Sequence, residues 1–281
     1  MDIYLADEHA FQLIPQFTLE VARDRLEQKK TNLVSGTLGS MFSRPKPEEI
    51  QFVSVENRLE PFWLVSVFVH TAYDRNCSYT IQLNGTEIKQ VTLFGQEFTP
   101  ISKDKGGANL NLSGVEHCVE ERRASYTFDG MSGMKGEFSK YLSFAKSEIL
   151  DLEHFAPAGI LVVPPLVHAT AVVRPVLAEV IKPILAQVIH EERVDLEAIE
   201  LIFRPVYAME YEWTTKGKHV ILEFDGLTGE MRSGGKKLRD QIKNMLTRDL
   251  LFDVTADAAG LLVPGGSIAV KLVKAVVDHK K

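Results

Sequence analysis

The sequence predicts an α+β protein made of two internally duplicated units, each an antiparallel β-meander with flanking helices. One observation is a pair of similar blocks, SYTFDGMSGMKGE at residues 125–137 and VILEFDGLTGEMRSG at residues 220–234. In both, Phe-Asp-Gly, an aliphatic residue, Ser or Thr, and Gly follow in the same order. A second observation is the alternation of apolar residues, as at Val65, Val67 and Val69, which is typical of strands.

Two further pairs of blocks repeat in the same order along the chain. AGILVVPP starts at Ala158 and AGLLVPGG starts at Ala259. Upstream, NRLEPFWLVSVF starts at Asn57 and LIFRPVYAMEY at Leu201, and each places a proline before two bulky residues and an alternating segment. A charged helical stretch also follows each Phe-Asp-Gly block, and four matching pairs in one order indicate two copies of a single unit.

The units are expected over residues 1–163 and 164–281, and the first carries an inserted hairpin and loop at about residues 73–120. Asn84-Gly85 within this insertion suits a type I′ hairpin turn. The stretch from Lys103 to Gly114 is polar and rich in Gly and Asn, so we expect an exposed, mobile loop there.

Within each unit we expect a helix, a three-stranded meander, a helix, an apolar connector and a final helix. Alternation places strands around residues 53–69 in the first unit, and at 207–213 and 220–224 in the second. Tight turns are expected at Asp129-Gly130 and Asp225-Gly226, because glycine adopts positive φ without a Cβ penalty.

A helix is predicted after Gly235, where apolar residues recur at helical spacing: Leu238, Ile242, Met245, Leu246 and Leu250. Its opposite face is basic and carries Lys236, Lys237, Arg239, Lys243 and Arg248. A solvated helix face explains this pattern, and contact with an anionic membrane surface or an acidic partner is the alternative.

A long apolar helix is predicted at residues 172–189, where apolar pairs recur every four residues. Pro175 and Pro183 would start or kink it. Such a wide apolar stripe needs burial on much of its circumference. The helix is therefore expected either to pack between the two units or also to line a homodimer interface.

Composition excludes several classes of protein. A net charge of -6 argues against a general nucleic-acid binder, and two cysteines are too few for a disulfide scaffold or a thiolate metal cluster. The start, MDIYLADEHAFQ, lacks the basic-then-apolar pattern of a signal peptide, so a cytoplasmic location is expected. The longest uncharged stretch, 154–173, is broken by prolines and is interpreted as core or interface rather than as a membrane span.

The segment KHVILEFDGLTGEM, residues 218–231, resembles the repeat of PepSY-like domains, whose meanders often carry a terminal Thr-Gly-Glu. The resemblance implies a helix-plus-meander unit that binds or inhibits another protein. It brings no catalytic residues with it.

Motifs for catalysis, cofactors and metals are absent from the sequence. The eight histidines show no metal-ligand spacing, and no phosphate-binding loop or nucleophile elbow is complete. We therefore expect no cofactor and no metal. One candidate for anion binding is the helix start at Gly234, Gly235, Lys236 and Lys237, whose free N–H groups could hold an anion.

Aromatic residues supply the candidate ligand site. The members are Phe62, Trp63, Tyr207, Tyr211 and Trp213. If these side chains line a groove between meander and helix, they could bind an apolar ligand or a peptide. Core packing is the alternative interpretation.

Two classes of function follow from the sequence. The first is a non-catalytic interaction or ligand-binding protein that self-associates or binds a protein partner. The second is a hydrolase-type or ligand-dependent enzyme with a site in the cleft between the units. Repeated meanders without a catalytic motif favour the first.

Overall fold

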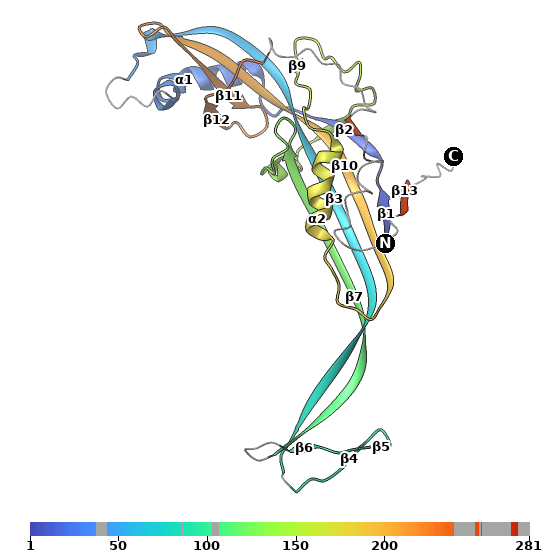
Figure 1. Ribbon diagram of the computed structural model, residues 1–281. Helices are drawn as coiled ribbons and strands as arrows, with labels where there is room; N and C mark the ends of the chain where they lie inside the picture. The colour runs from blue at the N-terminus through green and yellow to red at the C-terminus, as the bar shows by residue number, and fades with distance from the viewer. Residues whose placement is uncertain are drawn as a thin grey trace.

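The computed structural model is dominated by one mixed sheet with α-helices on it, an α+β architecture (Figure 1). It describes residues 1–37, 44–85, 87–102, 107–238, 251–252, 254 and 271–274. Along its main path the sheet runs β12-β11-β10-β3-β7-β6. The path strands are β3 (Ile50–Leu83), β6 (Ile101–Ser102), β7 (Ala108–Asp129), β10 (Val188–Trp213), β11 (Lys218–Asp225) and β12 (Met231–Ser233).

Short strands extend the sheet beside this path. β1 (Asp2–Leu5) and β2 (Glu8–Leu13) lie parallel to β10, and β9 (Leu161–Val162) lies parallel to β3. β8 (Lys146–Glu148) pairs with β2, and β13 (Lys271–Lys274) with β1. The AGILVVPP segment thus contributes β9 and the buried Val163 to the core, whereas AGLLVPGG falls outside the described residues.

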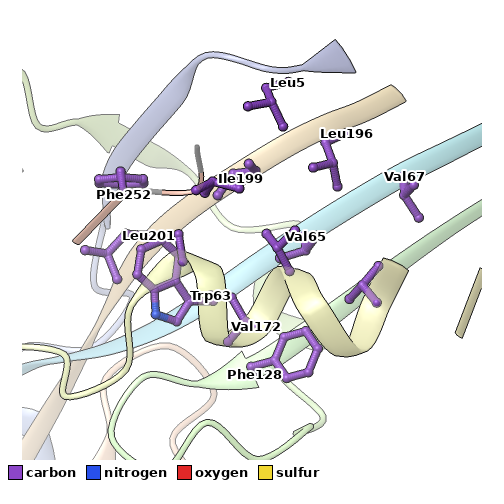
Figure 2. Close-up of a cluster of buried hydrophobic side chains, with 14 of the residues drawn as sticks. Leu5, Trp63, Val65, Val67, Phe128, Val172, Leu196, Ile199, Leu201 and Phe252 are labelled. Atoms are coloured by element: carbon purple, nitrogen blue, oxygen red, sulfur yellow. The ribbon is translucent and has the colours of Figure 1, made fainter. Parts of the chain in front are cut away.

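Helices α1 (Leu19–Thr37) and α2 (Ala169–Val180) pack on the same face of the sheet. The cluster that includes α2 contains Leu201 and Phe203, and the cluster that includes α1 contains Tyr207 and Met209. These four positions of β10 alternate with period two, so their side chains share one face. Figure 2 shows α2 lying over the apolar side chains of the first cluster. Single-turn 3₁₀ helices occur at Pro47–Glu49 and Ser139–Tyr141.

The long helix predicted at residues 172–189 is wrong in its extent. α2 begins at Ala169, ends at Val180 and contains Pro175, whereas Val188 and Ile189 already belong to β10. Pro183 explains the end, because a proline has no N–H to donate and disfavours helical backbone in the residue before it. The apolar side of the remaining helix, including Val172 and Leu177, is buried in the protein's own core.

The insertion predicted at about residues 73–120 forms a hairpin, but its turn is not at Asn84-Gly85. β3 ends at Leu83, and its partner Ala108 in β7 comes only after a separate small hairpin, β4 (Val91–Leu93) with β5 (Gln96–Phe98). The mobile loop expected at Lys103–Gly114 is also wrong in its second half, since residues 108–114 are part of β7. Asn and Leu alternate there, and this period of two carries the strand.

The turns at Asp129-Gly130 and Asp225-Gly226 have the same hydrogen bonds. The Gly130 N–H donates to the Pro61 carbonyl at 3.1 Å, and the Gly226 N–H donates to the Pro205 carbonyl at 2.9 Å. In both turns the Asp Oδ1 accepts two backbone N–H groups, from Met131 and Ser132 or from Leu227 and Thr228. The positive φ expected at Gly130 and Gly226 is wrong: the glycines at positive φ are Gly133 at 71° and Gly229 at 74°, which close the two turns.

The two prolines lie inside central strands, where proline is normally excluded. In an antiparallel strand the N–H and C=O of one residue point to the same side. Pro61 faces the end of β7, whose last pair is Phe62 with Asp129, and Pro205 faces the end of β11, whose last pair is Val206 with Asp225. The carbonyls of the glycines that donate to the two prolines accept from other residues, Gly130 from Leu166 and Val167 and Gly226 from Gln16 and Phe17, so the missing proline N–H groups leave neither without a donor.

We expect Gly130→Ala to destabilise the protein by about 1–3 kcal/mol. A Cβ at this glycine would come within 2.8 Å of both the Cβ and the backbone oxygen of Pro61, so the strand or the turn must shift. Gly36→Ala in α1 is the control, because no atom lies within 4 Å of its Cβ position. Urea unfolding of both variants measures the difference, and equal midpoints would contradict the tight approach of turn and strand.

Candidate functional site

A polar groove of about 590 Å³ lies on the sheet face opposite the helices. Its walls come from the segment after β7 and from the end of β11 with β12, and its floor contains Glu60 of β3 and Arg204 of β10. A second hollow, of about 340 Å³, adjoins it and shares Glu60, Glu223 and Arg232. The groove thus lies where the first and second halves of the chain meet, at the centre of the sheet.

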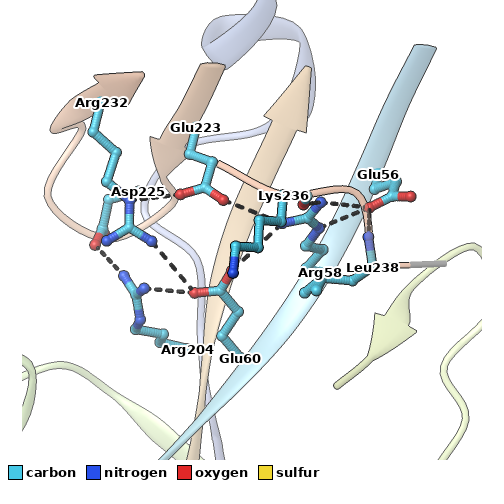
Figure 3. A network of polar contacts seen from close by, with 9 residues as sticks. All are labelled: Glu56, Arg58, Glu60, Arg204, Glu223, Asp225, Arg232, Lys236 and Leu238. Carbon is cyan, nitrogen blue, oxygen red and sulfur yellow. Dashed lines mark hydrogen bonds and ion pairs between the residues drawn. The ribbon is translucent and has the colours of Figure 1, made fainter. Parts of the chain in front are cut away.

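A network of mostly buried charges underlies the groove and the adjoining hollow (Figure 3). Arg204 Nη2 lies 2.6 Å from Glu60 Oε2, and its Nη1 lies 3.0 Å from Asp225 Oδ2. Arg58 is only 1% exposed and lies within 3.2 Å of Glu56 and Glu223 and 3.7 Å from Glu60. These side chains come from strands adjacent in the sheet, and β-strand alternation directs them all to one face.

Every buried carboxylate of this floor contacts a guanidinium. Burial alone would raise the pKa of Asp225, but hydrogen bonds from Tyr141 and from the Thr228 and Leu227 N–H groups, with the charge of Arg204, lower it. Burial chiefly raises the pKa of Tyr141. At neutral pH the Asp225 carboxylate is therefore ionised and the Tyr141 phenol protonated, and neither is poised to exchange a proton.

The anion site predicted at Gly234–Lys237 is wrong in its key feature. The N–H groups of Gly234 and Gly235 both donate to the Ile221 carbonyl, at 3.1 and 3.3 Å, so they are not free to hold an anion. The Lys236 carbonyl accepts from Arg58, and the Lys237 ammonium lies 3.3 Å from Glu210. Of the basic helix face, only Lys236 and Lys237 lie within the described residues.

The five predicted aromatic residues are core residues in this structure. Phe62, Trp63, Tyr211 and Trp213 are at most 2% exposed, and Tyr207 is buried. They belong to three separate clusters, so they form no common groove. The polar ends of Trp63 and Tyr207 are occupied too, since Nε1 donates to the Val167 carbonyl and the phenol to the Phe17 carbonyl.

A second candidate site is a two-stranded arm, residues 75–83 of β3 with 108–116 of β7. β10 pairs with β3 only as far as Asp74, opposite Val188, and beyond that point the other two strands run on alone, as Figure 1 shows. At about 3.4 Å per residue, nine residues extend roughly 30 Å from the body. Tyr79 and Ile81 of the arm are exposed, whereas Ala108 and Leu110 near its far end are buried by the chain itself.

The two faces of the arm differ in chemistry. Cross-strand partners share a face, so one face, called here the apolar arm face, carries Cys77, Tyr79, Ile81, Leu83, Ala108, Leu110, Leu112 and Gly114. The opposite face is mostly polar and carries Asn76, Ser78, Thr80, Gln82, Asn109, Asn111, Ser113 and Val115. Tyr79 is 50% exposed and Ile81 is 40% exposed.

The apolar arm face lies on the same side of the β3–β7 pair as the core of the body, with the Arg75–Glu116 ion pair between the two. Trp63, Val65, Val67 and Val69 of β3 lie under α2, and no register shift interrupts the pairing of β3 with β7 from there to Leu83. The end of α2 reaches only the neighbourhood of Thr71, where Val180 and Val69 line one small pocket. Beyond the helix, Tyr73, Leu110 and Ala108 of the same face are still buried, and only Tyr79 and Ile81 are largely exposed.

The tip of the arm exposes an aromatic residue in an unusual backbone conformation. Phe94 and Gly95 connect β4 to β5, with φ of 52° and 77°, as a type I′ turn requires. Asn or Gly normally takes the first of these positions, because other residues are strained there. Phe94 is fully exposed, which favours a recognition role over a structural one. The Phe-Gly pair between alternating Val91, Leu93 and Phe98 is the sequence signal for this hairpin.

Comparisons with known protein families, with curated proteins and with solved structures find no match to this chain. The resemblance to PepSY-like domains thus stays confined to a short local segment. Among the described helices, none is long and apolar enough to cross a membrane. In the same part of the chain, His, Cys, Asp and Glu side chains form no group of three suited to hold a metal ion.

Proposed function

We propose that this chain is a non-catalytic interaction protein, in which a β-arm extends from an α+β body and binds a protein partner. The arm carries this proposal. A two-stranded ribbon is marginally stable at best in water, and this one leaves Tyr79, Ile81 and Phe94 exposed. Ordering each residue costs roughly 1–2 kcal/mol of conformational entropy. An exposed apolar patch on an ordered extension is typical of a surface that is covered in a complex.

The body itself is inferred to be a duplicated unit. Residues 59–63 of β3 correspond to 203–207 of β10, and the two strands pair so that Glu60 lies opposite Arg204. Leu59 then pairs with Pro205 and Pro61 with Phe203, as a local twofold axis through Glu60 and Arg204 requires. The equal hydrogen bonds of the two Asp-Gly turns support the same relation. On this proposal the polar groove lies on the axis between the units.

The alternative function, an enzyme with its site in the cleft between the units, has weaker support. If the body is duplicated as inferred, the groove corresponds to that cleft, and its volume suits a small ligand. Its carboxylates, however, are paired with Arg58 and Arg204, which suits binding or structural roles rather than acid–base catalysis. Ligand binding in the groove is compatible with an interaction protein.

Excision of the arm tests the proposal. Residues 76–115 are replaced by Asn-Gly, which joins Arg75 to Glu116, a cross-strand pair already 2.5 Å apart at the closest charged atoms. We expect the melting temperature to change by less than about 4 °C, because the arm lies outside the core clusters of the body. A loss of more than about 10 °C would show that the arm stabilises the fold instead.

A photo-crosslinker then tests partner contact. We expect an amino acid of this kind at Phe94, at the tip of the arm, to yield a discrete protein adduct in cells. The same group at Leu150, a body residue that is 82% exposed, is the control and should yield none. Equal labelling at the two positions would count against the arm as the docking element.

A further inference from the structure

We propose that the outer edge of β7 pairs with the same edge of a second copy of this chain, antiparallel about a twofold axis at Val119, so that the two sheets join into one. This inference goes beyond the proposed function, because it assigns self-association to the edge of a strand and not to the faces of the arm. The tip residue Phe94 takes no part in the pairing.

β7 lies at the edge of the sheet along most of its length (Figure 1). β3 pairs with it from Ala108 to Asp129, whereas β6 on its other side covers only Ala108 and Asn109. Within the described part of the chain, no other backbone hydrogen bond reaches residues 111–125 of β7 from that side. A strand edge of this length presents a row of unpaired N–H and C=O groups, to which another strand can bind.

The turn at the end of β7 shows which backbone groups point outward. The Gly130 N–H faces β3, since it donates to the Pro61 carbonyl, whereas the Asp129 N–H points the other way and donates to the Met134 carbonyl. No register shift interrupts the pairing with β3, so the N–H and C=O groups of the odd-numbered residues point outward along the whole edge. The odd-numbered residues from 111 to 125 are all exposed, which leaves this row accessible.

The charges along the edge are complementary to themselves. When two copies of one strand pair antiparallel about a twofold axis, both sheets show the same face, and only positions of the same parity lie opposite each other. Val119 opposite Val119 of the second copy then places Glu116 opposite Arg122 and His117 opposite Glu121, and the axis repeats each pair. Opposite charges directly across an antiparallel pair are stabilising.

The neighbouring registers are less favourable. One step in one direction sets Glu116 opposite Glu120, and one step in the other sets Glu120 opposite its own copy. Like charges directly opposite each other destabilise a strand pair. The register centred on Val119 also uses the edge almost fully, over residues 113–125. It stops before Thr127, whose carbonyl already accepts from the Gly136 N–H.

The side chains nearest the axis suit such a contact. Val119 is 64% exposed and would be buried against its own copy. Glu116 is already paired with Arg75, and Arg122 with Glu120, in the same chain. Association therefore joins existing ion pairs across the axis and desolvates no lone charge. The same charges repel strands of unmatched sequence, which restricts the edge to a complementary partner.

Sedimentation equilibrium of the full chain between about 1 and 200 µM measures the association, under reducing conditions because both cysteines are free. We expect a dimer with a dissociation constant in the micromolar range, since a strand pair is a small interface. Arg122→Glu sets like charges opposite Glu116 twice in each dimer, and it should raise the dissociation constant at least about tenfold. Arg123→Glu is the matched control. It makes the same change one residue along, opposite Val115, and should alter the constant less than about threefold.

A mixture of two variants tests the register itself. Glu116→Arg alone sets two arginines opposite each other, and Arg122→Glu alone sets two glutamates opposite each other, so both homodimers should weaken. In a dimer of one chain of each kind, every arginine lies opposite a glutamate. We expect this mixed dimer to be at least about tenfold tighter than either homodimer. Its formation also shows that both variants are folded.

Three results would overturn the inference. A parent chain that stays monomeric at about 200 µM excludes pairing with a second copy. Equal weakening by Arg122→Glu and Arg123→Glu contradicts the register centred on Val119. A mixture of Glu116→Arg with Arg122→Glu that binds no more tightly than either variant alone contradicts the juxtaposition of these two positions. Crosslinking at Phe94 is independent of all three, so failure here and failure of the proposed function are distinguishable.

Discussion

Arg58→Met is expected to lower the free energy of unfolding by about 3–5 kcal/mol. The guanidinium is 1% exposed and lies among Glu56, Glu60 and Glu223, with a further hydrogen bond to the Lys236 carbonyl. Met fills a similar volume but leaves this group of buried carboxylates without its central cation. Removing one partner of a buried charge network costs far more than the network contributes relative to an apolar core.

Arg232→Met is the matched control for this prediction. Its side chain also contacts Glu223, at 2.5 Å, but is 62% exposed. Solvent screens this pair, and we expect a loss of at most about 1 kcal/mol. Urea denaturation at pH 7 compares the two variants. Similar losses would mean that burial does not set the energetics of the network.

Asp225→Ala is expected to cost about 3–5 kcal/mol, and its counterpart Asp129→Ala about 1–2 kcal/mol. Both carboxylates accept two backbone N–H groups in equivalent turns. Only Asp225 also contacts Arg204 and Tyr141, in a buried position. The difference between the two losses therefore measures the stability that Asp225 gains from its contacts with Arg204 and Tyr141. If both variants lose the same free energy of unfolding, the hydrogen bonds of the turn account for the whole contribution of Asp225.

The same residue gives a pH dependence of known sign. The folded-state pKa of Asp225 is lowered, whereas an unfolded Asp titrates near about 3.9. Its ionised form is thus favoured by folding, and this stabilisation is present above the unfolded value and is lost as the pH falls through the folded pKa. Urea midpoints between pH 7 and pH 3 should fall more steeply for the parent than for Asp225→Asn. Parallel curves would contradict the assignment.

Local features of this protein were predictable because they depend on near neighbours in the chain. Alternation at Val65–Val69 and at residues 207–213 predicts the strands, and Asp-Gly predicts the two turns. The end of α2 was also readable in principle, since Pro183 lies within a few residues of it. The arm was harder, because polar Asn residues alternate with Leu in residues 108–114 and resemble a loop in composition.

The sequence by itself determined which residues alternate, where the chain turns and which side chains are apolar enough for a core. Only the tertiary structure decided that Glu60 faces Arg204, that Arg58 contacts Glu223, and that β3 and β7 extend beyond the end of β10. A period of two states that a side chain lies on one face of a strand, but it names neither the neighbouring strand nor the register. The groove arises from the pairing of segments more than a hundred residues apart, and the arm begins where the pairing of β10 with β3 stops. No local sequence pattern encodes such long-range pairing.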